Sequence, residues 1–275
     1  MTDLVFAWEN WRFSWYKYED VIVKLINDHC NKWLMIVSFI ANDIWIDINE
    51  YFFIAETCPK TVEDVIMWGR KPPKADMILY FTNKTTWKII ERWVSIKSSN
   101  ISIQVLITNV TAFLAVCEWY WIDVSDTKLR VWLSKFCGFW QYKPSLILQP
   151  YEIELLEQWH RDRWLIHELE ADERASIHYF FEKNQKIITE IVLMKWSWRE
   201  KYWADYYLVN NNKFSDTWIV DFKIDNMENV INRTISKWYT ETSQWSFHIG
   251  YITVQMKWSW KWEAYHWLQF NKSGI

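Results

Sequence analysis

Tryptophan stands in this chain at positions where a fold requires glycine. Trp87 lies in the segment 83–88 between two apolar runs, where we expect a hairpin turn and where glycine supplies the positive φ that bulky residues resist. Trp33 follows a helical run at a position typical of a glycine C-cap. Trp119 and Trp121 lie in a similar loop. These positions therefore constrain the fold as glycines would.

The composition agrees with this interpretation. The chain has 24 Trp and 4 Gly in 275 residues, whereas about 7% Gly, or roughly 19 residues, is usual for this length. With glycine restored, the segments 195–199 and 257–262 change from KWSWR and KWSWKW to KGSGR and KGSGKG, which are flexible basic loops. Trp164 and Trp267 lie inside apolar runs and are interpreted as genuine tryptophans.

Our hypothesis for the cause is that many glycines are written as Trp, because UGA codons of a lineage that decodes them as glycine have been translated as tryptophan. UGG at most of these codons would contradict it. The alternative is a truly Trp-rich protein that stacks sugars or bases.

Charge, cysteines and hydropathy exclude several classes of protein. The net charge is −3, so DNA binding would depend on local basic loops. The four cysteines are widely spaced without a CxxC pair, as expected of reduced thiols in a cytosolic protein. The chain has no signal-peptide pattern at its start and no run of about 20 apolar residues. We therefore predict a cytoplasmic location and no membrane association.

Periodicity predicts a mixed α/β (α+β) chain. Helices are expected at 16–31, 61–67, 109–117, 127–136, 152–163 and 226–235, and strands at 34–40, 44–48, 77–81, 89–96, 187–194, 206–209, 219–224, 247–256 and 267–270. Prolines punctuate the segment 142–150. We predict a catalytic core in residues 1–145 and a DNA-recognition part in 146–275, either as two parts or as one continuous domain.

The most informative stretch joins two strands by the Asn-Lys-Thr-Thr turn. Asp76 begins the first strand and Lys97 ends the second, so an antiparallel hairpin brings both to one end of the sheet. Ser95 lies two residues before Lys97 and points to the same face. A carboxylate there can hold Mg²⁺, which activates water and polarises a phosphate. A lysine can position that water and stabilise the developing charge.

This arrangement resembles the core of the PD-(D/E)xK nuclease superfamily, with Lys-Ala-Asp76 and Ser95-Ile-Lys97 in the two motif positions. It looks most like a subset of type II restriction endonucleases in which the second acid is replaced. Such nucleases often carry a glutamate on the first helix, a place that Glu19 occupies here. The resemblance implies Asp76, Glu19, Ser95 and Lys97 as catalytic residues, with Asp76 and Glu19 as ligands of Mg²⁺.

A rival core remains open further along the chain. Asp205 precedes one apolar run, and Asp221 and Lys223 lie within the next, at 219–224. By pattern alone this is the better (D/E)xK match. It is ranked second because it lacks an acidic helix like that of Glu19, although Glu182 or Glu190 could fill that role.

A second resemblance lies at the C-terminal end. With glycines restored, residues 250–270 read GYITVQMKGSGKGEAYHWLQF, similar to the final strands and basic loop of several type II restriction endonucleases. Glycine lets backbone N–H groups approach phosphates, and lysine neutralises them. The candidate DNA-binding residues are Lys195, Arg199, Lys201, Gln255, Lys257 and Lys261.

The resemblance implies a magnesium-dependent, site-specific deoxyribonuclease with a restriction-endonuclease-like mixed central sheet flanked by helices. Its expected partners are double-stranded DNA, a second copy in a homodimer and, as a genetic partner only, a cognate methyltransferase. The alternative is a non-catalytic module that binds nucleic acid or sugar through the basic loops.

Overall fold

The computed structural model describes residues 16–64, 69–71, 73–98, 102–137, 169–196, 200–211, 221–236, 240–243, 246–256 and 267–273. The chain forms two compact units that interleave in sequence. Unit 1 comprises residues 1–64, 69–100 and 194–230, and unit 2 comprises residues 65–68, 101–193 and 231–275. The functional division near residue 145 stays a prediction.

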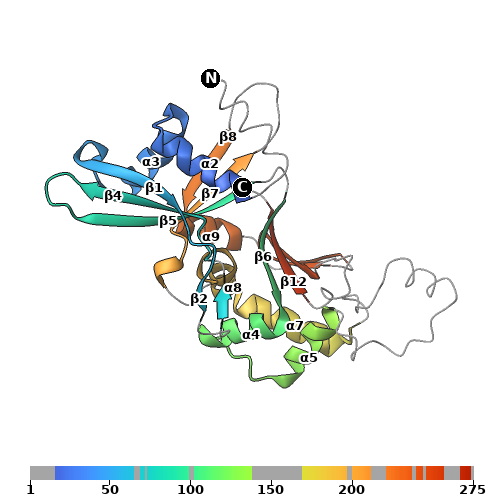
Figure 1. Cartoon of the computed structure of the whole chain (residues 1–275). Coiled ribbons are helices and arrows are strands. Elements are labelled where there is room, and N and C mark those ends of the chain that lie inside the picture. Colours follow the sequence, from blue (N-terminus) through green and yellow to red (C-terminus); the bar gives the residue numbers. More distant parts are fainter. Residues whose placement is uncertain are drawn as a thin grey trace. The chain divides into compact units, whose positions relative to one another are not determined.

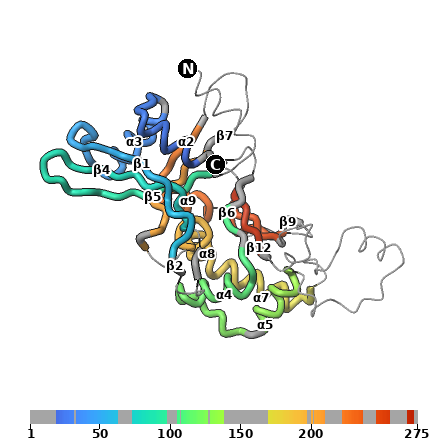
Figure 2. The backbone as a smooth tube through the Cα atoms, in the orientation of Figure 1, coloured from blue at the N-terminus to red at the C-terminus, as the bar shows by residue number. Residues whose placement is uncertain are grey.

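Unit 1 is built on a five-stranded mixed sheet, in the order β1-β4-β5-β7-β8. The strands are β1 (Tyr51–Thr57), β4 (Met77–Asn83), β5 (Ile89–Ser98), β7 (Tyr206–Asn211) and β8 (Asp221–Asn226). Strands β5 and β7 pair in parallel, and the other neighbours are antiparallel. Figure 2 shows β1, β4 and β5 running side by side. A short pair, β2 (Val62–Asp64) with β3 (Gly69–Lys71), lies apart from this sheet.

Two helices cover one face of this sheet (Figure 1). They are α2 (Tyr16–Asn27) and α3 (Asn31–Asp43). Alternate residues of β4 and β5 point into their shared core, with Met77, Leu79 and Val94 fully buried. The remaining residues of these strands, including Ser95, point to the opposite face, because side chains alternate along a strand. The two faces of β5 therefore separate the hydrophobic core from the polar site.

Two helices end on tryptophan in a left-handed conformation. Trp45 follows α3 and Trp121 follows α4 (Val110–Trp119), with φ of 58° and 63°. At both ends the N–H groups bond back to the last turn in the Schellman pattern, which favours glycine at this residue. Both indole rings are exposed, by 94% and 95%. The backbone requires a glycine conformation there, and the side chains contribute little packing.

Trp87 occupies a third left-handed position, with φ of 58°. It closes the β4–β5 turn, where its N–H donates to the Asn83 carbonyl at 2.9 Å. The Asn83 side chain caps the same turn by accepting from the backbone N–H groups of Thr85 and Thr86. This hairpin and the glycine-like conformation of Trp87 agree with the sequence-based expectation.

The prediction for Trp33 is wrong. The helix that begins at Tyr16 ends earlier, and His29 holds the left-handed position after it, with φ of 55°. Trp33 lies inside α3, buried, with its ring stacked on Phe222 at 5.3 Å. Its indole is part of the core, so this position does not require glycine.

Unit 2 combines an antiparallel sheet with helices. The sheet order is β6-β12-β11-β10-β9, with β6 (Ser102–Asn109), β12 (Trp267–Ser273), β11 (Ile252–Met256), β10 (Ser246–Ile249) and β9 (Thr240–Ser243). The helices are α4, α5 (Thr127–Phe136), α7 (Ala171–Lys183) and α8 (Gln185–Glu190), followed by the π-helix η5 (Ile191–Lys195). Phenylalanines join the two layers: Phe181 contacts Phe247 at 4.7 Å, and Phe113 contacts Phe270 at 5.3 Å.

Some predicted elements are corrected by the structure. The segment 34–40 is helical in α3, because the buried residues follow helical spacing, and 44–48 contains left-handed Trp45 before the short helix η2 (Ile48–Glu50). The segment 61–67 contains strand β2 where a helix was expected, and 187–194 is helical where a strand was expected. The helix predicted at 152–163 lies outside the described residues.

The predicted fold class is confirmed. The chain is α+β, and unit 1 is a mixed sheet flanked by helices α2 and α3. Helix α9 (Met227–Ile235) follows β8 directly. Within the described segments, no helix has both the length and the apolar character needed to cross a membrane.

Candidate active site

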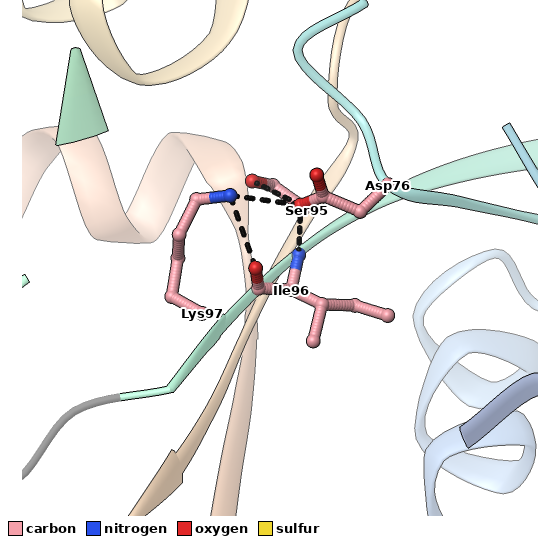
Figure 3. Close-up of polar contacts among 4 residues, drawn as sticks. All are labelled: Asp76, Ser95, Ile96 and Lys97. Carbon is pink, nitrogen blue, oxygen red and sulfur yellow. Dashed lines mark hydrogen bonds and ion pairs between the residues drawn. The ribbon is translucent and has the colours of Figure 1, made fainter. Parts of the chain in front are cut away.

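The hairpin of β4 and β5 assembles a polar corner at the beginning of β4 (Figure 3). Asp76 immediately precedes β4, and its Oδ2 accepts three hydrogen bonds from consecutive residues of β5. The donors are Ser95 Oγ at 3.2 Å, the Ile96 backbone N–H at 2.6 Å and Lys97 Nζ at 2.8 Å. The predicted convergence of Asp76, Ser95 and Lys97 is therefore present.

This corner is partly shielded from solvent. Ser95 is fully buried, whereas the side chains of Lys97 and Asp76 retain 19% and 18% of their exposure. Lys97 Nζ also donates to the Ile96 carbonyl at 3.0 Å. Because the three hydrogen bonds from Ser95, Ile96 and Lys97 converge on Oδ2, the lysine is held over one oxygen while the other points away from it (Figure 3).

Sheet register extends the corner into a row across four neighbouring strands. The Cys58 N–H, just after β1, donates to the Asp76 carbonyl at 3.0 Å, and the Asp76 N–H donates to the Val94 carbonyl at 2.9 Å. The parallel pairing of β5 with β7 then places Tyr207 directly opposite Ser95. Paired residues on adjacent strands point to the same face. Cys58, Asp76, Ser95 and Tyr207 therefore share one face of the sheet.

Glu19 joins this corner from helix α2. Burial raises the pKa of its carboxyl group from 4.5 to about 7, and the negative charge of Asp76 adds to this rise, while Lys97 opposes it. Charges act on one another in this way only over short distances in a partly buried site. Glu19 is thus within electrostatic reach of Asp76 and Lys97, and its role as a metal ligand stays a prediction.

Lys74 is a further charged residue of the corner that sequence analysis did not single out. It is buried, and burial lowers the pKa of its ammonium group to about 7, helped by repulsion from Lys97 and opposed by Asp76. Its place in the Lys-Ala-Asp triplet was visible in the sequence. However, a lysine before a strand is usually solvated, so the pattern gave no sign of its burial.

The remaining residues that sequence analysis missed are Cys58 and Tyr207. Burial raises the pKa of the Cys58 thiol above its ordinary value, and the charges of Asp76 and Glu19 raise it further. Burial, with a smaller contribution from Asp76, also raises the pKa of the Tyr207 hydroxyl. Neither residue belongs to a recognisable motif, and only the strand register connects them to the site.

The donor set fits a hard divalent cation. Asp76 and Glu19 supply carboxylate oxygens, the ligand type that Mg²⁺ prefers, and Mg²⁺ commonly takes one or two carboxylates together with water. Burial is the main cause of the raised pKa of Glu19, and the charge of Asp76 adds to it. A cation between the two carboxylates would remove this repulsion. Within the described residues, no group of three or more His, Cys, Asp or Glu side chains has metal-binding geometry.

The structure does not bring the rival core together. Asp205 precedes Tyr206, which pairs with Asn226, whereas Asp221 pairs with Asn211 at the other end of the β7–β8 hairpin. At about 3.3 Å per residue, the two acids are roughly 20 Å apart along the strands. Lys223 is exposed partway between them.

Asp205 has a structural contact instead. Its Oδ2 accepts from the Trp93 backbone N–H at 2.8 Å, and its own N–H donates to the Trp93 carbonyl at 2.7 Å. These two bonds extend the parallel pairing of β5 with β7.

Few of the predicted DNA-binding side chains lie within the described residues. Lys195 ends η5 with its Nζ 4.8 Å from the centre of the Trp203 ring, and Gln255 is half-buried in β11. Lys201 lies in the short helix η6 (Glu200–Tyr202), where only the backbone is described. The remaining candidates, Arg199, Lys257 and Lys261, lie outside the described residues.

The mixed sheet, its helical layer and the polar corner together have a restriction-endonuclease-like fold. Among solved structures, the chain is similar to the crystal structure of restriction endonuclease MspI in complex with its cognate DNA. The TM-score is 0.56 at 14% identity, over 91% of this chain and 83% of that chain. Likeness at this identity shows the fold. No family model and no curated protein matches the sequence.

Proposed function

We propose that this protein is a type II restriction endonuclease that hydrolyses DNA phosphodiester bonds with Mg²⁺ at the Asp76 corner. The observation that carries the proposal is the contact between Lys97 Nζ and Asp76 Oδ2, at 2.8 Å. It lies at one end of a sheet whose fold resembles that of a restriction endonuclease solved with DNA.

Asp76 and Glu19 would hold the cation. When bound, Mg²⁺ lowers the pKa of a water molecule and polarises the phosphate. Ser95 and the Ile96 N–H fix the orientation of the Asp76 carboxylate through their bonds to Oδ2. Such partners orient a ligand and tune its affinity for metal.

Lys97 would act on the reacting groups. Its ammonium hydrogens can hold the attacking water at Nζ and stabilise negative charge that develops on the phosphate oxygens. Lys74 lies close by, since Lys97 contributes to lowering its pKa to about 7, and near neutral pH it therefore carries part of a second positive charge. Two lysines near the carboxylates would offset their negative charge and favour the binding of a negatively charged DNA phosphate.

The proposed partners follow from the same function. Double-stranded DNA would be bound in part through the basic segments at 195–201 and 257–261. A homodimer would supply one active site for each DNA strand, and a methyltransferase encoded nearby would protect the host DNA. The competing function, a binding module without catalysis, would use the basic segments alone.

The test is plasmid cleavage by purified wild-type protein and four variants, with and without Mg²⁺. We expect discrete fragments only with Mg²⁺, and a loss of at least about 100-fold for Asp76→Asn and Lys97→Met, the size typical of removing one electrostatic stabiliser. The matched controls are Asp205→Asn and Lys223→Met, which change the same residue types in the rival core. We expect both controls to keep cleaving.

Two outcomes would reject this assignment. Full cleavage by Asp76→Asn would exclude the Asp76 corner, and loss of cleavage in Lys223→Met would move the site to the rival core. A shift of DNA in a gel without cleavage by the wild type, at any Mg²⁺ concentration, would favour the binding module.

A further inference from the structure

The hydroxyl of Tyr207 is an unusual group beside the proposed site. Tyr207 is only 2% exposed, and its oxygen is sealed from solvent and has no hydrogen-bond partner among the residues that the structure describes. Buried polar groups in native proteins are nearly always paired, because an unpaired one loses its hydration without compensation. A group of this kind calls for a partner that arrives with a ligand.

The position of Tyr207 points to the cation proposed at Asp76 as that ligand. It lies on β7 directly opposite Ser95, and Ser95 Oγ donates to Asp76 Oδ2 at 3.2 Å. Asp76 raises the pKa of the Tyr207 hydroxyl in addition to the effect of burial. The hydroxyl is therefore within electrostatic reach of the carboxylate proposed to bind the cation.

The hydrogen bonds that Asp76 Oδ2 already accepts leave no free position on that oxygen for the Tyr207 hydroxyl. Lys97 Nζ, Ser95 Oγ and the Ile96 N–H already converge on Oδ2. A cation at Asp76 would compete with the positively charged Lys97 for the same carboxylate, and so the hydrogen bonds around Asp76 would be redistributed. Tyr207, which lies opposite Ser95 on the neighbouring strand, carries a buried hydroxyl that could then donate to an oxygen of this corner.

We propose that Tyr207 is a positioning residue for the metal site, whose hydroxyl becomes hydrogen-bonded within the Asp76–Ser95 corner, directly or through one internal water, when a divalent cation is bound. This inference rests on the proposed function, because it assumes a cation at Asp76. A hydrogen bond that forms only in the metal-bound protein would stabilise that form relative to the metal-free form. It would therefore increase the affinity for the metal. Buried from solvent, Tyr207 would not contact DNA.

The test compares two adjacent tyrosines. Tyr207→Phe removes an unpaired hydroxyl, so the metal-free protein should melt at the same temperature as the wild type or higher. Its affinity for Mn²⁺, measured by electron paramagnetic resonance without DNA, should fall by about 10- to 100-fold, as for other residues that orient a metal ligand. DNA cleavage at low Mg²⁺ should fall in parallel.

Tyr206→Phe is the matched control. Tyr206 packs in the core on the other face of the sheet, and its hydroxyl donates to Asp43 Oδ2 at 2.7 Å. This variant should melt at a lower temperature and keep the wild-type Mn²⁺ affinity. The two neighbouring substitutions are therefore expected to have opposite effects.

An unchanged Mn²⁺ affinity in Tyr207→Phe, in a wild type that binds Mn²⁺ and cleaves DNA, would overturn this inference and leave the proposed function intact. A wild type that neither binds Mn²⁺ nor cleaves DNA would overturn both. A lower melting temperature of metal-free Tyr207→Phe would also overturn it, since the hydroxyl would then be paired without metal.

Discussion

At the scale of single residues, the tryptophans divide into two groups that the sequence treats alike. Trp45, Trp87 and Trp121 are exposed and have a positive φ. Trp33, in helix α3, and Trp93, in strand β5, are buried. Only the first group has a positive φ, the backbone conformation that tryptophan resists and glycine adopts easily. The glycine hypothesis is therefore supported at these positions and has to be applied position by position.

The first group gives a direct stability prediction. Replacing Trp45, Trp87 or Trp121 by Gly should stabilise the protein by roughly 0.5–1 kcal/mol at each position, because relief of left-handed strain exceeds the added entropy of the unfolded chain. Urea denaturation of each variant measures this change. Trp33→Gly is the control and should destabilise by roughly 3–5 kcal/mol, since it leaves a large cavity. Destabilisation by Trp87→Gly would contradict the interpretation.

Glu19 gives a pH-dependent prediction. Its pKa is about 7 in the folded protein and 4.5 ordinarily, so between these values the folded state binds more protons than the unfolded state. Stability should therefore fall as pH rises from about 4.5 to 7, where the charged carboxylate is disfavoured by burial and by Asp76. Glu19→Gln cannot titrate and should lack this contribution.

Denaturation of both proteins in EDTA, from pH 4.5 to 8, measures the effect of Glu19. The stability of Glu19→Gln relative to the wild type should increase with pH and level off above pH 7. A difference that stays constant across this range would show that Glu19 is an ordinary solvated residue of helix α2.

At the scale of elements, local patterns predicted hairpins better than long-range pairings. The β4–β5 hairpin could be read from two apolar runs and a turn, and with it the meeting of Asp76 and Lys97. The neighbour of β5 in the sheet is β7, and the Trp93–Asp205 bond that closes this pairing spans 112 residues. The hydrophobic periodicity of a sequence does not show which distant strands pair. The place of Tyr207 in the site was therefore not predictable.

Two of the wrong element predictions share one physical cause. Residues 34–40 and 187–194 are rich in Ile and Val, which favour strands when considered one at a time. In the structure their buried residues follow helical spacing, as with Ile36, Val37 and Ile40 in α3. Because these helices are apolar over much of their surface, tertiary packing stabilises the helical conformation more than local propensity favours a strand.

At the scale of the whole molecule, folding and metal binding should be linked. The proposed ligands, Asp76 and Glu19, come from a strand end and a helix that meet only in the folded unit 1. A cation that binds the folded state alone stabilises it by about 2.7 kcal/mol at 100 times its dissociation constant. Mg²⁺ should therefore raise the melting temperature of the entire cooperative unit.

This stabilisation should depend on pH, because a proton on Glu19 competes with the cation for the same carboxylate. We expect a larger Mg²⁺-induced shift in melting temperature at pH 8 than at pH 6, with NaCl at matched ionic strength as the control for screening. Asp76→Asn should abolish the shift at both pH values, and Glu19→Gln should reduce it and remove its pH dependence. An equal shift in the wild type and in Asp76→Asn would mean that Mg²⁺ acts elsewhere on the protein, and the Asp76 corner would lose its assignment as the metal site.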